Sequence, residues 1–146
     1  MTSSMKSRAP VKLKVILDTS VCVAALLSKS GGSAKVFEAV SSSRVHGFYT
    51  DEMLAEITEV LKRKKFNLEK EKRERFIHLF VESAFLVKPL KEFEVAKCRD
   101  PKDDVFLSLA NQIEADFLVS LDLDLLDLKK LGVTMIVDPA AFLKQL

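Results

Sequence analysis

Several features that other protein classes depend on are scarce in this sequence. Its 146 residues include two cysteines, Cys22 and Cys98, which lie far apart and form no C-x-x-C pair. Such a spacing indicates free thiols, not a disulfide scaffold or a zinc site. The longest apolar stretch, residues 15–27, is shorter than the roughly 20 residues that cross a membrane, and it contains Asp18. The same carboxylate excludes a signal peptide, so we expect a cytoplasmic protein without a membrane segment.

Histidine is equally scarce, which narrows the possible chemistry. The two histidines, His46 and His78, fall in a predicted strand and in a predicted charged helix, so no Ser-His-Asp or Cys-His arrangement is evident. The sequence also has no internal repeat and no low-complexity tract. Its length fits one domain, for which roughly 100–150 residues is typical. We assign residues 13–146 to a single domain and the polar, basic residues 1–12 to a flexible N-terminal arm.

Short β-branched runs alternate with helical patterns along the chain. Five runs are typical of buried strands: residues 13–17, 45–49, 85–87, 117–121 and 133–137. Capping residues and apolar spacing predict helices over residues 21–27, 34–40, 50–61, 68–84, 101–114, 125–130 and 140–146. This alternation predicts an α/β fold, a parallel sheet with helices on both faces. In such folds, ligands bind beyond the carboxyl ends of the strands.

The small net charge of +2 conceals two regions of opposite charge. Residues 62–75 contain eight basic and three acidic side chains, whereas residues 100–138 contain nine acidic and three basic ones. A basic arm and an acidic half can bind a polyanion and a cation, respectively. A solvated helix opposite an acidic, loop-rich face is an equally good interpretation of the same pattern.

Carboxylates come from four separate segments at the sheet edge where ligands bind. They are Asp18 after the first strand, Glu56 one turn into the helix after the second, Asp103 and Asp104 in the first turn of the helix over 101–114, and Asp122 and Asp124 after the fourth strand. Like charges in one cleft repel one another, and a divalent cation removes that repulsion. Oxygen ligands without His or Cys favour Mg²⁺ or Mn²⁺ over zinc. Such ions activate water and stabilise charge in phosphodiester hydrolysis.

Each carboxylate also has a structural interpretation. Asp18 could cap the following helix, although its place at the end of an apolar strand favours a function. Glu56, taken alone, is more typical of a solvent-facing helix residue. Asp103 falls on the inward face of its helix but also fits a capping box. Spacing does not separate Asp122 from Asp124.

Four segments of the chain carry a family resemblance: VILDTSV at residues 15–21, TDEMLAEITEVLKRKKF at 50–66, CRDPKDDVFLSLA at 98–110 and FLVSLDLDLLDL at 117–128. Together they resemble the PIN domain family, and within it the prokaryotic toxin components related to VapC toxins. The resemblance spans about residues 13–146. It implies a three-layer α/β/α fold with a central, mainly parallel sheet of about five strands. It also implies an endoribonuclease that depends on Mg²⁺ or Mn²⁺ and cuts single-stranded RNA.

The resemblance also assigns roles to individual residues. By motif, the catalytic and metal-binding residues are Asp18, Glu56, Asp103 and Asp122, with Thr19 and Ser20 as small polar groups near the metal and Asp104 and Asp124 as additional metal ligands. The family often has Asn at positions 20 and 104 and Gly at position 121. The extra acid at Asp104 leaves open whether Asp103 or Asp104 contacts the metal.

A basic segment follows the helix that carries Glu56. Its residues Lys62, Arg63, Lys64 and Lys65 could hold RNA phosphates beside the cleft, or could simply form a solubilising surface. Tyr49 and Phe66 are the candidates for stacking on RNA bases. The resemblance further implies an antitoxin protein that blocks the cleft, and a homodimer.

Two other functions compete with a nuclease. The first is a non-catalytic module that keeps the PIN fold and binds RNA or a protein. The second is a phosphoacceptor signalling domain, which also gathers acids at the carboxyl edge of a parallel sheet. Asp18-Thr19-Ser20 lacks the paired acids that such a domain has after its first strand, and no Lys follows the last strand, where Val137-Asp138 stands. The sequence therefore favours the nuclease over the signalling domain.

Overall fold

A computed structural model describes residues 11–146, so most of the predicted arm over residues 1–12 lies outside the described part of the chain. The strands are β1 (Lys14–Leu17), β2 (His46–Tyr49), β3 (Phe85–Leu86), β4 (Phe117–Val119), β5 (Lys130–Leu131) and β6 (Thr134–Val137). The α-helices are α2 (Thr19–Leu27), α3 (Gly32–Ser41), α4 (Asp51–Leu61), α5 (Lys70–Ser83), α6 (Pro101–Ile113), α7 (Leu123–Leu126) and α8 (Pro139–Leu143). Two 3-10 helices, η1 (Lys64–Phe66) and η2 (Lys91–Phe93), lie in connections.

The six strands form one sheet in the order β3-β2-β1-β4-β6-β5. Strand β1 pairs in parallel with β2 on one side and with β4 on the other. The β5–β6 pair is antiparallel. The predicted α/β fold with a mainly parallel sheet is therefore confirmed, with six strands where about five were expected. Because the chain builds outward in opposite directions from β1, the boundary between β1 and β4 is a topological switch point, where α/β folds bind ligands.

The strand missing from the sequence prediction is β5. The predicted helix over residues 125–130 is too long, because α7 ends at Leu126 and Lys130–Leu131 pair with β6. Gly132 has a φ of 57°, a left-handed conformation that glycine adopts without steric cost. This glycine therefore forms the turn of the β5–β6 hairpin.

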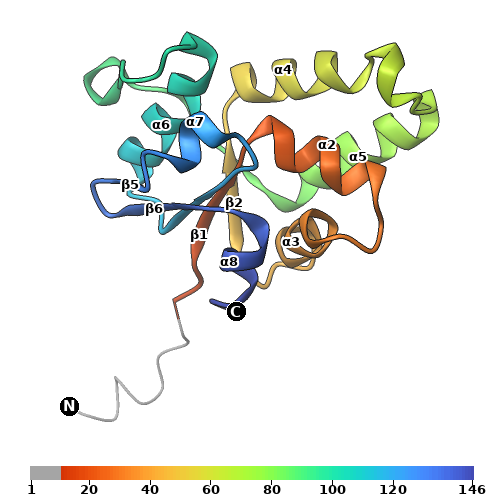
Figure 1. Cartoon of the computed structure of the whole chain (residues 1–146), viewed down its shortest axis with the longest axis horizontal. Coiled ribbons are helices and arrows are strands. Elements are labelled where there is room, and N and C mark those ends of the chain that lie inside the picture. Colours follow the sequence, from red (N-terminus) through yellow and green to blue (C-terminus); the bar gives the residue numbers. More distant parts are fainter. Residues whose placement is uncertain (1–10) are drawn as a thin grey trace.

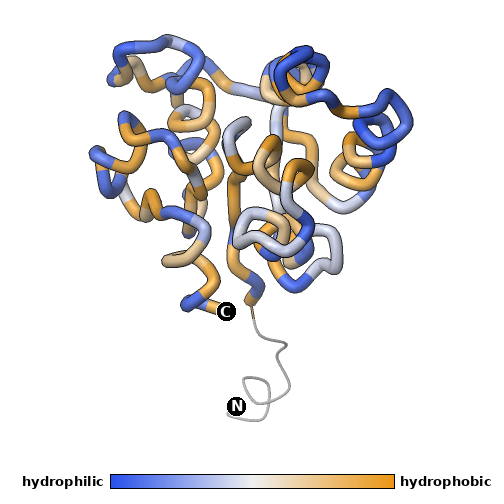
Figure 2. Tube along the Cα trace, turned by 45° about the vertical axis from the view of Figure 1, so that its right-hand side comes forward, coloured by the Kyte–Doolittle hydropathy of each residue, from blue (hydrophilic) through white to orange (hydrophobic). Residues whose placement is uncertain are grey.

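Helices cover both faces of the sheet. Figure 1 shows α6 and α7 on one side of the central strands, and α2, α3 and α5 on the other. The apolar segments gather along the central strands, while hydrophilic turns lie at the periphery (Figure 2). Val15, Ile16 and Leu17 of β1 are buried, which makes this strand the middle of the core. No helix within residues 11–146 is long and apolar enough to cross a membrane.

Candidate active site at the switch point

Asp18 sits at the centre of the candidate site. It follows β1 directly and caps α2, and its side chain is 3% exposed. Its Oδ1 accepts hydrogen bonds from Ser20 Oγ at 2.6 Å and from the Val21 N–H at 3.1 Å, and its Oδ2 accepts one from Ser120 Oγ. Burial raises the pKa of Asp18, while these three donors oppose that shift. The cap predicted from sequence is thus real, and it fixes the carboxylate at the switch point.

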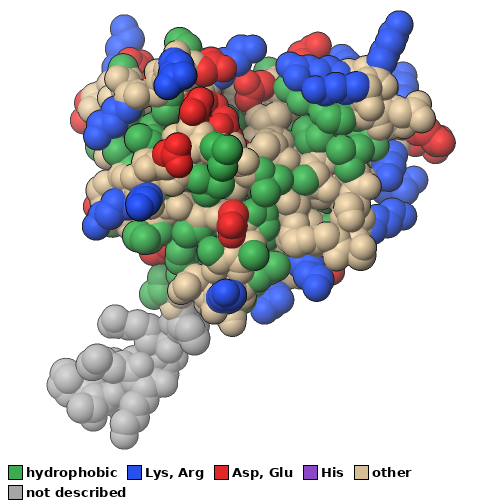
Figure 3. Space-filling model, in the orientation of Figure 1, with side chains coloured by type: hydrophobic (Ala, Val, Ile, Leu, Met, Phe, Trp, Pro, Cys, Tyr) green, Lys and Arg blue, Asp and Glu red, His purple; other side chains and the backbone are tan. Residues whose placement is uncertain are grey.

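A cavity of about 430 Å³ opens beside Asp18. Its walls include six of the residues predicted for the site: Asp18, Thr19, Ser20, Glu56, Asp103 and Asp122. These residues come from α2, α4, α6 and the turn after β4. The structure therefore brings together carboxylates from four segments that are far apart in the sequence. Figure 3 shows acidic side chains gathered near α6 and α7, and Lys and Arg side chains over α4.

Glu56 is tied to the start of α2. Its Oε2 accepts a hydrogen bond of 2.6 Å from Thr19 Oγ1, so the hydroxyl next to Asp18 orients a carboxylate from another helix. Helix α4 can reach the site because Thr50 caps it directly after β2, the strand beside β1. The partial burial of Glu56 agrees with its contact to Thr19 and differs from the solvent-facing position that its sequence neighbours suggest.

The pKa of Asp103 is raised by burial and by the negative charges of the site. Burial, followed by the charges of Asp122, Asp100, Asp18 and Asp124, raises the pKa of Asp103 from 3.8 to about 6. Asp122 lies directly after the turn that ends β4 and caps α7, where its Oδ1 accepts the Asp124 N–H at 2.9 Å. The carboxylates thus lie near enough to influence one another's ionisation.

The alternatives Asp104 and Asp124 occupy different positions. Asp104 Oδ1 accepts the backbone N–H groups of Lys97 and Cys98 at 3.0 and 2.8 Å, so this side chain holds the loop before α6. Asp104 does not line the carboxylate cavity, whereas Asp103 does. Asp124 is exposed in the first turn of α7 and is likewise absent from the cavity walls.

The oxygen atoms of the site suit a hard cation, but the carboxylates are not clustered closely. Among residues 11–146, no three His, Cys, Asp or Glu side chains lie close enough together to hold a metal ion. Asp18, Asp103, Asp122 and Glu56 nevertheless face one cavity with oxygen atoms only, which is the ligand chemistry that Mg²⁺ and Mn²⁺ prefer. Neighbouring charges already raise the pKa of Asp103, and a cation would relieve this repulsion. The chemistry of the donor set therefore fits Mg²⁺ or Mn²⁺.

The predicted basic segment divides between two surfaces. Arg63 lines the carboxylate cavity, whereas Lys62 lines a separate cavity between α4 and α5. Lys64 and Lys65 are exposed on η1. Of the two candidate stacking residues, Phe66 is half-buried in the cavity wall, and Tyr49 is buried in the core with 4% exposure.

Sequence reasoning missed one contributor to the site, Ser120. This serine is fully buried, donates to Asp18 and accepts the backbone N–H of Asp122 at 2.9 Å. A polar residue at the end of an apolar run, two positions before an acid, was the available signal. Asp100, which caps α6, and Lys102 also line the cavity.

Comparison with known proteins identifies the family. A model of the PIN domain matches residues 14–124, so the chain belongs to the PIN domain family, as its motifs predict. MJ1680, an uncharacterized protein of Methanocaldococcus jannaschii, is 24% identical over 128 residues, which are 86% of this chain and 81% of that protein.

A solved structure supports the fold. In the crystal structure of VapBC2 from Rickettsia felis bound to a DNA fragment from its promoter, one chain superposes with a TM-score of 0.58. The two chains are 17% identical, and the match covers 85% of this chain and 97% of that one. This match confirms the fold that the sequence predicts.

Proposed function

We propose that this protein is a metal-dependent endoribonuclease that cuts phosphodiester bonds of single-stranded RNA in the Asp18 cavity. The observation that carries this proposal is that carboxylates from four segments line one cavity at the switch point of a PIN-domain sheet. Proteins of this family are generally nucleases. The cavity walls hold five carboxylates, from Asp18, Glu56, Asp100, Asp103 and Asp122, which are groups that can bind a divalent cation.

The carboxylates of the site would have different roles in catalysis. Asp18, Asp103 and Asp122 would hold Mg²⁺ or Mn²⁺, and Glu56 would complete the ligand set or orient the attacking water. When bound, the metal supplies a nucleophilic water at neutral pH and stabilises charge on the attacked phosphate and the leaving oxygen.

The remaining side chains position the carboxylates and the substrate. Ser20 and Ser120 fix the orientation of the Asp18 carboxylate, and Thr19 orients Glu56. Arg63 from the turn after α4 and Lys102 from α6 line the same cavity and can pair with the phosphate groups of the RNA.

The proposed biological role is that of the toxin in a toxin–antitoxin pair. A chain with this fold occurs in VapBC2, which was crystallised with DNA from its promoter. By analogy, the partner of this chain would be a small cognate antitoxin that closes the cavity. A homodimer of the chain is part of the same proposal.

Cleavage of a mixed-sequence single-stranded RNA by the purified protein tests the activity. We expect products with Mn²⁺ or Mg²⁺ and none with EDTA. Asp18→Asn should abolish cleavage without unfolding the protein, whereas Asp51→Asn, an exposed carboxylate outside the cavity, should leave it unchanged. Cleavage by Asp18→Asn, or cleavage that persists in EDTA, would contradict the proposal.

One observation favours the alternative of a non-catalytic module that binds RNA or a protein. The carboxylates do not form a ready cluster for an ion among the described residues. Assays of RNA binding and of cleavage with and without Mn²⁺ separate the two functions, because a binding module, with or without bound metal, predicts RNA binding without metal-dependent products. Saturable Mn²⁺ binding that Asp18→Asn removes would support the nuclease.

A further inference from the structure

A second cavity, between α4 and α5, has no part in the site above. It measures about 700 Å³. Thr58, Leu61 and Lys62 line it from α4 and the residue that follows, whereas Glu56, Val60 and Arg63 line the carboxylate cavity. Residues two positions apart in a helix point in directions that differ by about 200° around its axis. The residues that line the two cavities therefore face opposite sides of α4. The cavities are therefore separate, and the chain over residues 60–63 runs between them.

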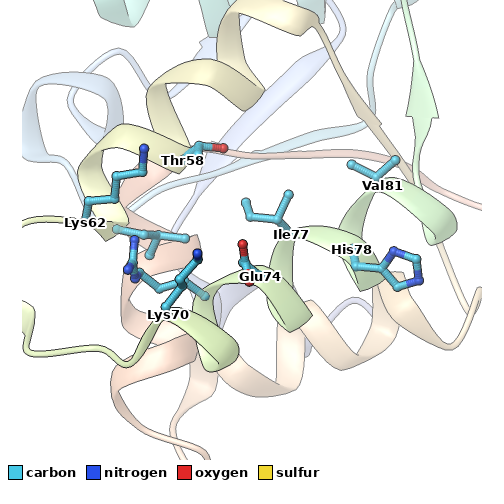
Figure 4. Close-up of a pocket in the computed structure, with 9 residues that line it drawn as sticks. Thr58, Lys62, Lys70, Glu74, Ile77, His78 and Val81 are labelled. Atoms are coloured by element: carbon cyan, nitrogen blue, oxygen red, sulfur yellow. The ribbon is translucent and has the colours of Figure 1, made fainter.

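Positive charge exceeds negative charge in this second cavity. Lys62, Lys70 and Arg73 line it together with one carboxylate, Glu74. Figure 4 shows Lys62 and Lys70 at the same end of the cavity, approaching from α4 and α5, while His78 lies at the other end. Such an arrangement is suited to an anionic ligand that enters between the two lysines.

The basic side chains of the cavity form few ion pairs with acidic side chains. Lys62 makes one exposed contact of 3.4 Å with Glu59, and within residues 11–146 neither Lys70 nor Arg73 forms an ion pair. The Nε atom of Arg73 is buried and has no hydrogen-bond partner within the same part of the chain. A buried donor without a partner costs free energy that an acceptor on a ligand recovers.

We propose that this cavity, the α4–α5 groove, is a second RNA-binding site that holds the phosphate backbone of the strand leaving the carboxylate cavity. The inference rests on the proposed nuclease function. Arg63 in one cavity and Lys62 in the other are consecutive residues, so a strand that crosses the turn after α4 meets both. Exposed Lys64 and Lys65 extend the positive surface along that crossing.

The groove also offers apolar surface beside its charges. Ile77 and Val81 line it from α5 and are partly accessible, whereas Leu61 is buried. A positively charged groove that follows the backbone is one of the features of proteins that bind single strands. Its continuity with the basic edge of the carboxylate cavity favours RNA over an acidic protein as the ligand.

The test measures binding of a labelled single-stranded RNA of about 20 nucleotides in EDTA, so that cleavage does not interfere. The Lys62→Ala/Lys70→Ala double variant removes two exposed lysines and should fold normally. We expect its affinity to fall about 25-fold at 0.1 M salt, and the slope of log K against log salt to become shallower by about 1.4. Lys130→Ala/Lys144→Ala, which removes two exposed lysines outside both cavities, should bind like the wild type.

The possible outcomes separate the two proposals. A double variant with unchanged affinity and slope overturns the groove as an RNA site, while cleavage by the wild type would leave the nuclease standing. A wild-type protein that neither binds nor cleaves RNA overturns both proposals.

Discussion

Ser120 Oγ donates a hydrogen bond to the Asp18 carboxylate, a contact between residues 102 positions apart in the sequence. The same oxygen accepts the backbone N–H of Asp122 at 2.9 Å. One buried hydroxyl therefore joins the carboxylate after β1 to the backbone that places the carboxylate after β4. Because Asp18 is almost fully buried, it has little access to water as a substitute for this donor.

Replacement of this hydroxyl gives the first prediction. Ser120→Ala leaves Asp18 Oδ2 without its donor and should raise the pKa of Asp18 further. We expect the protein to lose about 1–3 kcal/mol of stability. Mn²⁺ affinity should fall about 10–100-fold, as it does when partners of metal ligands are removed. Urea denaturation and Mn²⁺ titration measure the two effects.

A serine outside the site provides the matched control. Ser41 Oγ bonds the carbonyl of Glu38 at the exposed end of α3, so Ser41→Ala should change neither quantity appreciably. Equal Mn²⁺ affinities for wild type and Ser120→Ala would show that the serine does not support the metal site.

The second prediction distinguishes Asp103 from Asp104. Asp103 lines the carboxylate cavity, whereas Asp104 holds two backbone N–H groups of the preceding loop. Asp103→Asn should therefore abolish Mn²⁺ binding and cleavage with little loss of folding. Asp104→Asn should retain both and lose about 1 kcal/mol of stability through its weakened hydrogen bonds. The reverse pattern in metal titration would assign the ligand to Asp104.

The third prediction concerns the dependence of stability on pH in the metal-free protein. The pKa of Asp103 is about 6 in the folded chain, above its usual value of 3.8. Between about pH 4 and 6 the folded protein therefore binds more protons than the unfolded one, and the free energy of unfolding falls as pH rises through this window. Above the folded pKa this contribution stays constant.

Comparison with Asp103→Asn isolates the effect. Urea denaturation in EDTA should show the wild type losing stability relative to the variant between about pH 4 and 6. The raised pKa of Asp18 acts in the same direction in both proteins, so it largely cancels in the difference. A difference that does not change with pH would mean that the Asp103 carboxylate feels neither burial nor its neighbours' charges.

The sequence predictions for the fold succeeded where local signals are strong and failed where a tertiary contact determines the structure. The buried run at residues 13–17 and the Asp100-Pro101 helix start are strong local signals, and the structure places a strand and a helix there. Strand β5 was missed because its two residues, Lys130–Leu131, have no alternation that could reveal them. Their pairing with β6 is a tertiary contact, which short-range patterns do not encode.

For the candidate site, too, local patterns were informative and tertiary contacts were not. The rule that ligands bind at the carboxyl edge of a parallel sheet located Asp18 and Asp122 without any knowledge of contacts. The separation of Asp103 from Asp104 depended on which side chain turns toward the loop over residues 97–98, and this loop has no regular structure. Ser120 remained hidden because its role requires Asp18, which is distant in the sequence.

The fourth prediction is that Phe66 stacks on an RNA base. This ring is half-buried in the wall of the carboxylate cavity, and Lys65 Nζ lies 5.1 Å from its centroid. Phe66→Ala should weaken binding by about 1–3 kcal/mol for the stacked base, and Phe66→Tyr should retain it. Fluorescence quenching of an RNA containing 2-aminopurine measures stacking in EDTA. Phe85→Ala, at the exposed edge strand β3, is the control and should not change the quenching.

The last prediction tests how closely β2 packs against α3. Gly47 is buried in β2, and a Cβ at this position would lie 2.7 Å from Val40 Cγ1, well inside normal contact. Val40 is fully buried and has no room to turn away. Gly47→Ala should therefore destabilise the protein by about 1–3 kcal/mol, the usual cost of an overpacked core. Urea denaturation measures this loss.

A second substitution shows whether the clash is the cause. Val40→Ala alone creates a cavity and should also destabilise, but it removes the methyl group that a Cβ on Gly47 would meet. The double variant should therefore lose less stability than the two single variants together, with a coupling of about 0.5–3 kcal/mol. Gly32→Ala, whose Cβ would meet Pro139 Cβ at an ordinary 3.5 Å, is the control and should cost little. Strict additivity at positions 40 and 47 would place the strain elsewhere, because only a shared contact couples the two sites.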